Sequence, residues 1–484
     1  MNVLKDLSPQ TVMHWFEVVC SIPHPSLREE KLSSFLMQFA RERNLECIED
    51  EYRNILIRKP ASPGREDRPG LVLQSHMDMI CAVEEGVEHD FDTQGLDLYI
   101  DGDKIRARGT TLGADNGIGV AYQLAILDDD TLIHPAIEAV FTTAEEIGMV
   151  GASHFDARQL RGRTMINFDA GGFTEGRIYV GCAGNQKALL RQRVTFDPCP
   201  VREALRIDLT GLQGGHSGGD IQKGRGNSSV LLGRLLAFLL QENAQILSLS
   251  SGDTTQENKN GIPAQCMVLL YPADMPRLTE SLRRFERSLQ DELRGVDDGV
   301  CLRLSAADGS ARVLSQTSVQ TLSRLLQVLP NGVLSMQHTF SDVPECSGNI
   351  GNVELDGDTV VYYLSARSCK ESLLASMCQK WRAAAALSGA SLEEGQPLPS
   401  WDYDPDSPVR KLVEQEYLRE FNAQPRFKVT HAGTECSLFK KAVPDMDIIS
   451  MGPIIYDEHT PREYMGIESI GVLWTFVKNI LKQL

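Results

Sequence analysis

The chain has 484 residues, of which 42% are hydrophobic, and a formal net charge of −18 at pH 7. A chain of this length is too long to fold around one ordinary hydrophobic core, and the length predicts about three domain-sized units. The negative charge argues against nucleic acids and anionic membrane surfaces as partners. We therefore expect neither kind of partner, while cationic or zwitterionic small molecules remain compatible with the charge.

The cysteines and the N-terminal segment indicate a reducing compartment. The 11 cysteines are scattered without CxxC or CxxH pairs, which argues against a disulfide framework and a thiolate zinc site. The segment MNVLKDLSPQTVMHWF lacks the apolar core of a signal peptide, and no apolar stretch reaches membrane-spanning length. We expect a cytoplasmic protein with reduced, mostly buried cysteines.

Buried strands and helices are predicted for the first 186 residues. The segments PGLVLQSHMDM, IEAVFTTAEE and RTMINFDAG are typical of buried strands, and GIGVAYQLAILDDD predicts an amphipathic helix after the first of them. This order indicates an α/β domain. Such domains place their sites at the carboxyl ends of the strands, where polar residues follow in this chain.

The pattern changes after IYVGCAG at 178–184. Alternating strands such as EALRIDLTGL, QCMVLLYP and TVVYYLSAR follow, separated by helical segments such as SSVLLGRLLAFLLQE. Beyond the loop at 393–408, a helix–strand–helix order returns. We therefore expect a discontinuous catalytic domain of residues 1–186 and 399–484, and an inserted α+β domain of residues 187–398.

Short motifs carry histidine and acidic residues in a fixed order. They are QSHMDM (74–79), GTTLGADNG (109–117), TTAEEIG (142–148), INFDAGG (166–172) and DEHTP (457–461). Their candidate metal ligands are His76, Asp115, Glu146, Asp169 and His459. Imidazoles and carboxylates without a thiolate suit Zn²⁺, with Co²⁺ or Mn²⁺ as substitutes. The ligand carboxylates and a bridging hydroxide would neutralise two zinc ions, so we expect two Zn²⁺ per chain.

Taken singly, each motif also has an ordinary structural interpretation. His76 is equally a histidine at the end of a strand, Asp115 a helix N-cap, and Glu145 with Glu146 a solvated acidic pair. The coincidence of all the ligands, at strand ends and in loops, favours the metal site. Because strand positions i and i+2 face the same side, Asp78 is expected to hold the ring nitrogen of His76 that does not bind metal.

Glu145 is the acid left outside this ligand set. Two ions about 3.5–4 Å apart would share a bridging water, lower its pKa and polarise a carbonyl group. Glu145 is then expected to take the proton of that water and pass it to the leaving amine. The motifs therefore predict a hydrolase.

The motif series resembles the two-zinc metallopeptidase family that includes carboxypeptidase G, peptidase T and peptidase V. The resemblance extends from CSIPHPS (20–26) through GLQGGHSGGDI (211–221) to HAGTECSLFKK (431–441) and IESIG (467–471). It implies an aminopeptidase-like two-zinc domain with an inserted lid. One zinc would be bound by His76, Asp115 and Asp169, the other by Asp115, Glu146 and His459, with Glu145 as general base and Asp78 as orienting residue.

The resemblance also implies a substrate class. Family members with Asp at the position of Asp169 tend to hydrolyse dipeptides, and Xaa-His dipeptides are the expected substrates. The alternatives are a broader dipeptidase, an N-acyl amino acid amidohydrolase and a peptide-binding homologue without activity. Departures from the usual relatives at 170–176 and Ser437 concern the rim of the pocket, so the substrate preference is less constrained than the reaction.

Residues of the inserted domain are assigned to the substrate by the same resemblance. His216, in GGHSGG, would stabilise the oxyanion, and Asn260 and Arg367 would hold the substrate backbone and its C-terminal carboxylate. Gly433 lies in a segment implied to line the pocket. Without the resemblance, GGHSGG is equally a glycine-rich turn. By itself, Arg367 at a strand end is more often a surface residue.

The length of the insertion bears on the oligomeric state. Relatives with a lid of about one hundred residues dimerise and take the matching histidine from the partner, whereas this insertion has roughly 210 residues, enough for two such modules. We therefore expect His216 to act within its own chain. A homodimer is compatible with this prediction but is not required for the site.

Overall fold

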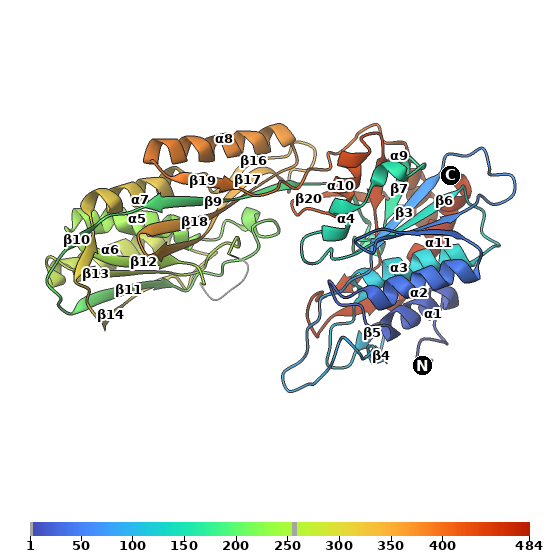
Figure 1. The fold of residues 1–484 in the computed structure, drawn as a ribbon, viewed down its shortest axis with the longest axis horizontal. Coiled ribbons are helices and arrows are strands. Elements are labelled where there is room, and N and C mark those ends of the chain that lie inside the picture. The colour runs from blue at the N-terminus through green and yellow to red at the C-terminus, as the bar shows by residue number, and fades with distance from the viewer. Residues whose placement is uncertain (1–2, 254–258) are drawn as a thin grey trace. The chain divides into compact units, whose positions relative to one another are not determined.

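The computed structural model describes residues 3–253 and 259–484. The chain divides into two compact units. Unit 1 comprises Met1–Gly181, Trp401–Val429 and Thr434–Leu484, and unit 2 comprises Cys182–Ser400 and Thr430–Gly433 (Figure 1). Unit 1 is thus formed by both ends of the chain, and its mixed α/β fold confirms the predicted class.

The main sheet of unit 1 has the strand order β1-β2-β6-β3-β7-β21-β8-β20. Its central strands β6, β3, β7 and β21 run parallel, and β1 and β2 join antiparallel at one edge. The bounds are β1 Glu46–Glu49, β2 Ile55–Lys59, β3 Leu71–His76, β6 Ile137–Thr142, β7 Thr164–Asn167, β8 Arg177–Cys182, β20 Arg426–Thr430 and β21 Asp447–Ser450. Strands β3 and β6 are buried along their whole length, their polar residues included, as expected for central strands of an α/β sheet.

The helices of unit 1 are α1 Gln10–Ser21, α2 Glu30–Glu42, α3 Ala114–Asp128, α4 Val150–His154, α9 Pro408–Phe421, α10 Glu435–Ala442 and α11 Ile467–Gln483, with 3₁₀ turns at Ala157–Gln159 and Phe173–Glu175. Helix α3 contacts β3 on one side and α1 on the other. Residues 116–127 of α3 are all buried. The expected amphipathic helix is therefore wrong, because α1 covers the side that would otherwise face solvent.

A small antiparallel sheet joins distant parts of unit 1. Its order is β22-β23-β5-β4, with bounds β4 Leu98–Asp101, β5 Lys104–Ala107, β22 Ile455–Tyr456 and β23 Tyr464–Gly466. Met465 on β23 pairs with Ile105 on β5. The DEHTP motif lies between β22 and β23, so this sheet fixes a C-terminal motif against an N-terminal segment.

Unit 2 is built on an antiparallel sheet of order β14-β11-β13-β12-β17-β18-β9-β19, with β16 paired to β17, and a small β10-β15 pair. Its strands are β9 Gly184–Arg193, β10 Phe196–Pro198, β11 Ala204–Thr210, β12 Gln245–Ser251, β13 Cys266–Tyr271, β14 Cys301–Ala307, β15 Arg312–Leu314, β16 Gly332–Met336, β17 Pro344–Asp356, β18 Thr359–Ser368 and β19 Ser391–Glu394. Its helices are α5 Ser228–Gln241, α6 Met275–Glu292, α7 Gln316–Val328 and α8 Glu371–Ser388, with a 3₁₀ turn at Ile221–Lys223. Helices α5 and α8 pack on this sheet (Figure 1), and their apolar residues form its core with Leu364 and Tyr362.

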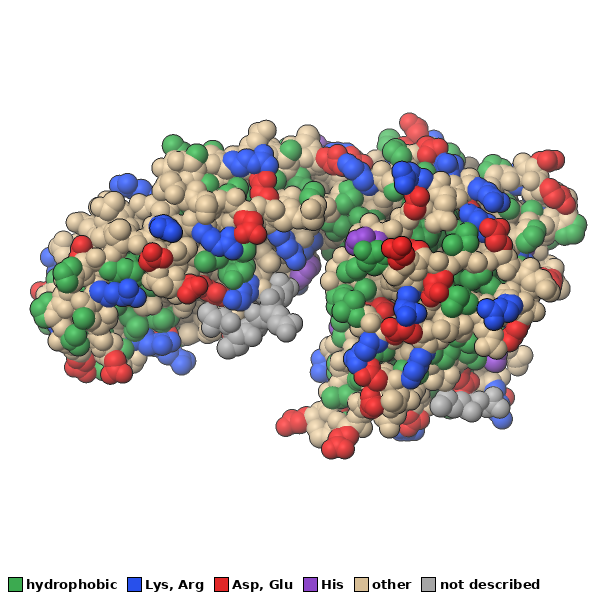
Figure 2. All heavy atoms as spheres, viewed as in Figure 1, with side chains coloured by type: hydrophobic (Ala, Val, Ile, Leu, Met, Phe, Trp, Pro, Cys, Tyr) green, Lys and Arg blue, Asp and Glu red, His purple; other side chains and the backbone are tan. Residues whose placement is uncertain are grey.

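Charged side chains of both signs lie on the surface (Figure 2), and the cysteines are free thiols. Acidic and basic side chains are interspersed over the visible face of each unit (Figure 2). The described residues form no disulfide, and most of the cysteines are buried. Within 3–253 and 259–484, no helix has the length and apolar character needed to cross a bilayer.

Candidate active site

The predicted metal ligands come together in unit 1. His76 ends β3, and Glu146 and Asp169 follow β6 and β7. Parallel strands end at the same edge of a sheet, which explains why these residues meet. Asp115 lies in the first turn of α3 and is not its N-cap, and His459 lies between β22 and β23.

The ligand atoms form two sets that share Asp115. Nε2 of His76 lies 3.2 Å from Oδ1 of Asp115 and 3.6 Å from Oδ1 of Asp169. Nε2 of His459 lies 3.4 Å from Oδ2 of Asp115 and 3.0 Å from Oε1 of Glu146. Each oxygen of Asp115 therefore faces a different histidine, an arrangement that fits two cations held on either side of one carboxylate.

The electrostatics of this cluster also fit bound cations. Burial raises the pKa of Asp169 to about 6; His76 opposes the rise, and the charges of Asp115 and Glu146 add to it. Contacts with Asp115 and Glu146 raise the pKa of His459 to about 11 despite its burial. Carboxylate oxygens and imidazole nitrogens in this number are a donor set suited to Zn²⁺, and divalent ions would relieve the repulsion between the acids.

Asp78 links His76 to the Glu145–Glu146 segment. Its carboxylate accepts hydrogen bonds from the hydroxyl of Ser26 (2.8 Å) and from the backbone N–H groups of Glu145 (3.0 Å) and Glu146 (3.3 Å). Nδ1 of His76 lies 3.1 Å from the main-chain oxygen of Asp78 and 3.4 Å from its carboxylate. Asp78 thus contacts the imidazole ring of His76 through its main-chain oxygen and through its carboxylate. The predicted carboxylate contact is the longer of the two.

Two further carboxyl groups lie near the ligands. Burial raises the pKa of Glu145 well above its ordinary value. Glu435, at the start of α10, is fully buried, and its Oε2 accepts hydrogen bonds from Gln74 (2.5 Å) and Thr142 (2.7 Å). Its Oε1 has no hydrogen-bond partner among the described residues, and burial raises the pKa of Glu435 to about 7. A buried acceptor without a partner requires an explanation, such as a ligand.

The loop that carries His459 is held in an uncommon conformation. His459 has φ +63°, in the left-handed region that residues with a side chain rarely adopt. Four positions later, Glu463 is buried and accepts hydrogen bonds from backbone N–H groups that include that of Asp115. The sequence analysis did not predict a role for Glu463. Its position four residues after His459 was the one feature of the sequence that pointed to the site.

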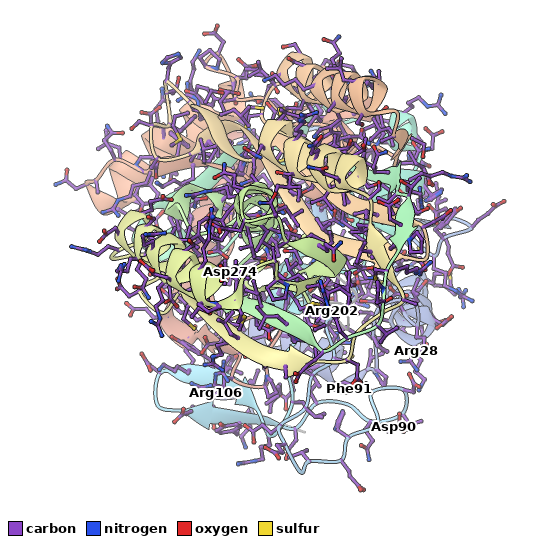
Figure 3. All side chains as sticks on the ribbon, turned by 90° about the vertical axis from the view of Figure 1, so that its left-hand side faces the viewer. Arg28, Asp90, Phe91, Arg106, Arg202 and Asp274 are labelled. Atoms are coloured by element: carbon purple, nitrogen blue, oxygen red, sulfur yellow. The ribbon has the colours of Figure 1, made fainter. Side chains whose placement is uncertain are left out.

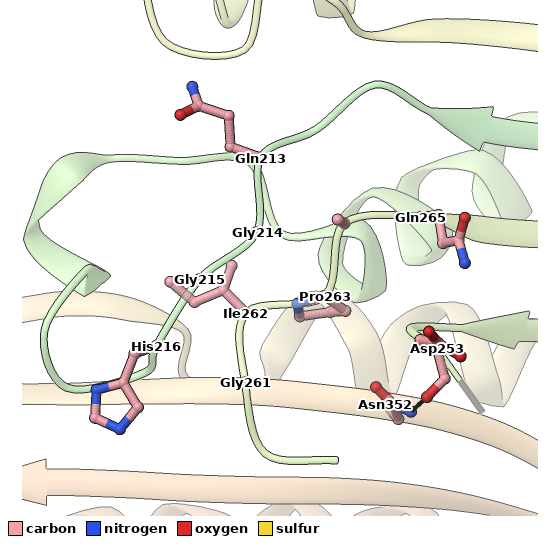
Figure 4. A pocket seen from close by; sticks show the side chains of 11 residues that line it. Gln213, Gly214, Gly215, His216, Asp253, Gly261, Ile262, Pro263, Gln265 and Asn352 are labelled. Carbon is pink, nitrogen blue, oxygen red and sulfur yellow. Dashed lines mark hydrogen bonds between the residues drawn. The ribbon is translucent and has the colours of Figure 1, made fainter. Parts of the chain in front are cut away.

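In unit 2, the GGHSGG loop pairs with the segment that contains Asn260. The N–H of Gly215 donates to the oxygen of Ile262 (3.3 Å), and the N–H of Ile262 donates to that of Gly215 (2.8 Å). Asn349 donates to the main-chain oxygen of Asn260 (2.9 Å). These two segments line a cavity of about 450 Å³ that includes His216 (Figure 4).

Arg367 lies beside His216. A Cβ atom added to Gly218 would be 3.0 Å from Cε1 of His216 and 3.1 Å from Cζ of Arg367, so both side chains contact this glycine. Arg367 is 9% exposed, burial lowers its pKa to about 10, and its Nε has no hydrogen-bond partner within the described parts of the chain. A buried guanidinium with an unpartnered Nε fits a carboxylate ligand.

His431 and Gly433 also belong to unit 2. Nε2 of His431 lies 2.7 Å from the hydroxyl of Ser347, and burial and the charge of Arg367 lower the pKa of His431 to about 3. Sequence analysis missed both His431 and Ser347 as candidates. A Cβ atom added to Gly433 would lie 2.2 Å from Leu398, which gives this glycine a packing role; its contact with substrate stays a prediction.

Comparisons with known proteins cover almost the whole chain. The model of peptidase family M20/M25/M40 matches residues 72–483. The cytosol non-specific dipeptidase of Escherichia coli (strain K12) is 37% identical over 488 residues, covering 100% of this chain and 99% of that protein. The crystal structure of aminoacylhistidine dipeptidase from Vibrio alginolyticus has a TM-score of 0.90 and 34% identity, covering 99% of this chain and 98% of that one. Aminopeptidase PepT from Bacillus cereus ATCC 10987 shares the fold, with a TM-score of 0.62 and 14% identity over 99% of both chains.

Proposed function

Since the chain belongs to peptidase family M20/M25/M40 and is a metallopeptidase, we propose that it hydrolyses dipeptides in the cytoplasm, Xaa-His dipeptides among them. The observation that carries the proposal is the pair of ligand sets sharing Asp115, with Glu145 beside them. The names of the Escherichia coli and Vibrio alginolyticus relatives support dipeptides as the substrate class.

The metal centre is assigned from the contacts of its ligands. His76, Asp115 and Asp169 would hold one divalent ion, and Asp115, Glu146 and His459 would hold a second, with Zn²⁺ as the expected metal. Bound ions of this kind lower the pKa of water and polarise a carbonyl group.

Glu145 is assigned the proton transfers. Its backbone N–H is bonded to Asp78, which also contacts His76, so the segment that bears the base is tied to a ligand. The Glu145 carboxylate would accept a proton from the attacking water and deliver it to the nitrogen of the leaving amine.

Each unit contains a buried charged group that would suit one end of a dipeptide. The unpartnered Oε1 of Glu435 is assigned to the α-amino group of the substrate. Arg367 is assigned to the C-terminal carboxylate and His216 to the oxyanion, as the family resemblance implies. Recognition of the α-amino group by Glu435 would favour dipeptides over N-acyl amino acids, which lack that group.

A substrate panel tests the proposal. The full chain with added Zn²⁺ is assayed on Xaa-His dipeptides, other dipeptides, tripeptides and N-acyl amino acids. We expect kcat/KM for dipeptides to exceed that for the other classes at least about tenfold. Replacing Glu435 by Gln should lower kcat/KM for dipeptides and remove much of their advantage over N-acyl amino acids. Faster hydrolysis of N-acyl amino acids would indicate an amidohydrolase, and metal binding without hydrolysis would indicate a binding protein.

A further inference from the structure

We propose that Glu463 is a positioning residue of the metal centre. It holds the backbone of residues 112–115 so that Asp115 presents one carboxylate oxygen to each ligand set. This inference rests on the proposed two-ion site. Glu463 itself is not a ligand; it acts through Asp115.

The carboxylate of Glu463 bonds to consecutive backbone groups. Its Oε2 accepts hydrogen bonds from the N–H groups of Leu112 (2.8 Å) and Gly113 (3.0 Å). Its Oε1 accepts hydrogen bonds from those of Ala114 (2.9 Å) and Asp115 (3.3 Å). Glu463 is 2% exposed, so solvent water cannot readily take its place as acceptor.

The start of α3 cannot satisfy these N–H groups by itself. The first N–H groups of a helix have no acceptor within the helix, and Gly113, at the N-cap, has no side chain to provide one. Gly113 has φ +64°, and Asp115 has ψ 105°, outside the helical range. A carboxylate at this position supplies the missing acceptors and is favoured by the peptide dipoles of the helix.

The same side chain connects two of the predicted ligands. Glu463 follows His459 on the loop between β22 and β23, and its N–H donates to the main-chain oxygen of Thr460 (3.0 Å). One end of this link is the backbone of Asp115, and the other is the loop of His459. Because Oδ2 of Asp115 lies 3.4 Å from Nε2 of His459, a shift of either segment changes the separation of these ligand atoms.

Metal titration of the Glu463→Gln variant tests the proposal. A glutamine offers one acceptor oxygen and turns an NH₂ group toward N–H donors. Metal-free full-length protein is titrated with Co²⁺ against a chromophoric chelator, and the visible spectrum of the Co²⁺ form is recorded. We expect Co²⁺ affinity to fall about 10–100-fold and the spectrum to change. Glu468→Gln, the same replacement at an exposed position of α11, should match the wild type in both measurements.

Unchanged Co²⁺ affinity and an unchanged spectrum in folded Glu463→Gln would overturn the proposal, whatever happens to thermal stability. Hydrogen exchange of the metal-free wild type provides a test that needs no variant. The amides of residues 112–115 should exchange slowly, because their acceptor is Glu463 and not a ligand of the metal. Exchange as fast as in an exposed loop would equally overturn it. Neither readout uses peptide hydrolysis, so a chain that binds ions and cleaves no dipeptide would refute the proposed function alone.

Discussion

Replacing Asp78 by Asn tests whether one carboxylate organises both a metal ligand and the general base. Asp78 is 1% exposed. Its Oδ1 accepts a hydrogen bond from the N–H of Glu145, and its Oδ2 accepts hydrogen bonds from the N–H of Glu146 and the hydroxyl of Ser26. An asparagine keeps one acceptor oxygen, so its NH₂ group must face one of these donors.

The size of the effect follows from these contacts. If the NH₂ group replaces Oδ2, the hydroxyl of Ser26 can turn and accept from it, but the N–H of Glu146 loses its acceptor. If it replaces Oδ1, the N–H of Glu145 loses its acceptor. Either way one hydrogen bond to a charged group is lost, which lowers the free energy of unfolding by about 1.5–3 kcal/mol. Disturbing the partner of His76 should also weaken metal binding about 10–100-fold, equivalent to about 1.4–2.7 kcal/mol.

The assays are urea unfolding of the metal-free protein and metal titration against a chelator. Asp90→Asn is the matched control. Asp90, labelled in Figure 3, accepts from the hydroxyl of Thr93 (2.7 Å) and the N–H of Asp92 (2.9 Å) at an exposed site. Its replacement should change the free energy of unfolding by less than about 0.5 kcal/mol and leave metal affinity unaltered. Metal affinity in Asp78→Asn equal to that of the wild type would refute the reasoning.

Further predictions concern the metal, the base, the unit 2 residues and pH. Chelation should abolish activity, and about two equivalents of Zn²⁺ or Co²⁺ should restore it; full activity after rigorous chelation would contradict the metal assignment. Glu145→Gln should keep its metal, and its kcat should fall about 10²–10⁴-fold. Loss of metal in this variant would show that Glu145 is the ligand and Glu146 the base. Mixing His216→Ala with Glu145→Gln under subunit exchange should restore no activity; recovery would place His216 across an interface. His431 has a folded pKa of about 3 against 6.5 for free histidine, so its stabilising effect is complete above pH 6.5 and is lost as pH falls toward 3. In His431→Asn, the slope of unfolding free energy with pH should decrease by up to about 1.4 kcal/mol per unit between about pH 4 and 6, and equal slopes would contradict this.

The catalytic strands and the ligand motifs could be predicted because their signals are local. Strands β3 and β6 each contain a short apolar stretch; His76 is the last residue of β3, and Glu145–Glu146 follow shortly after the end of β6. The parallel α/β arrangement then requires these residues to meet at one edge. The prediction that α3 is amphipathic was wrong because the pattern within one helix does not show what packs against it. Helix α1 covers the side of α3 that would otherwise face solvent.

By itself, the sequence determined the mixed α/β class, the family and the identity of the residues that cluster, since these depend on short patterns of polarity and residue type. Only the tertiary structure showed that each oxygen of Asp115 faces a different histidine, and that the guanidinium of Arg367 is buried. Only the tertiary structure showed that Glu463 accepts from the start of α3, a contact between residues 348–351 positions apart. In the sequence, Glu463 has the same local pattern as a solvated surface acid. Its burial and its partners exist only because β5 and β23 pair across the chain and bring its loop to that helix.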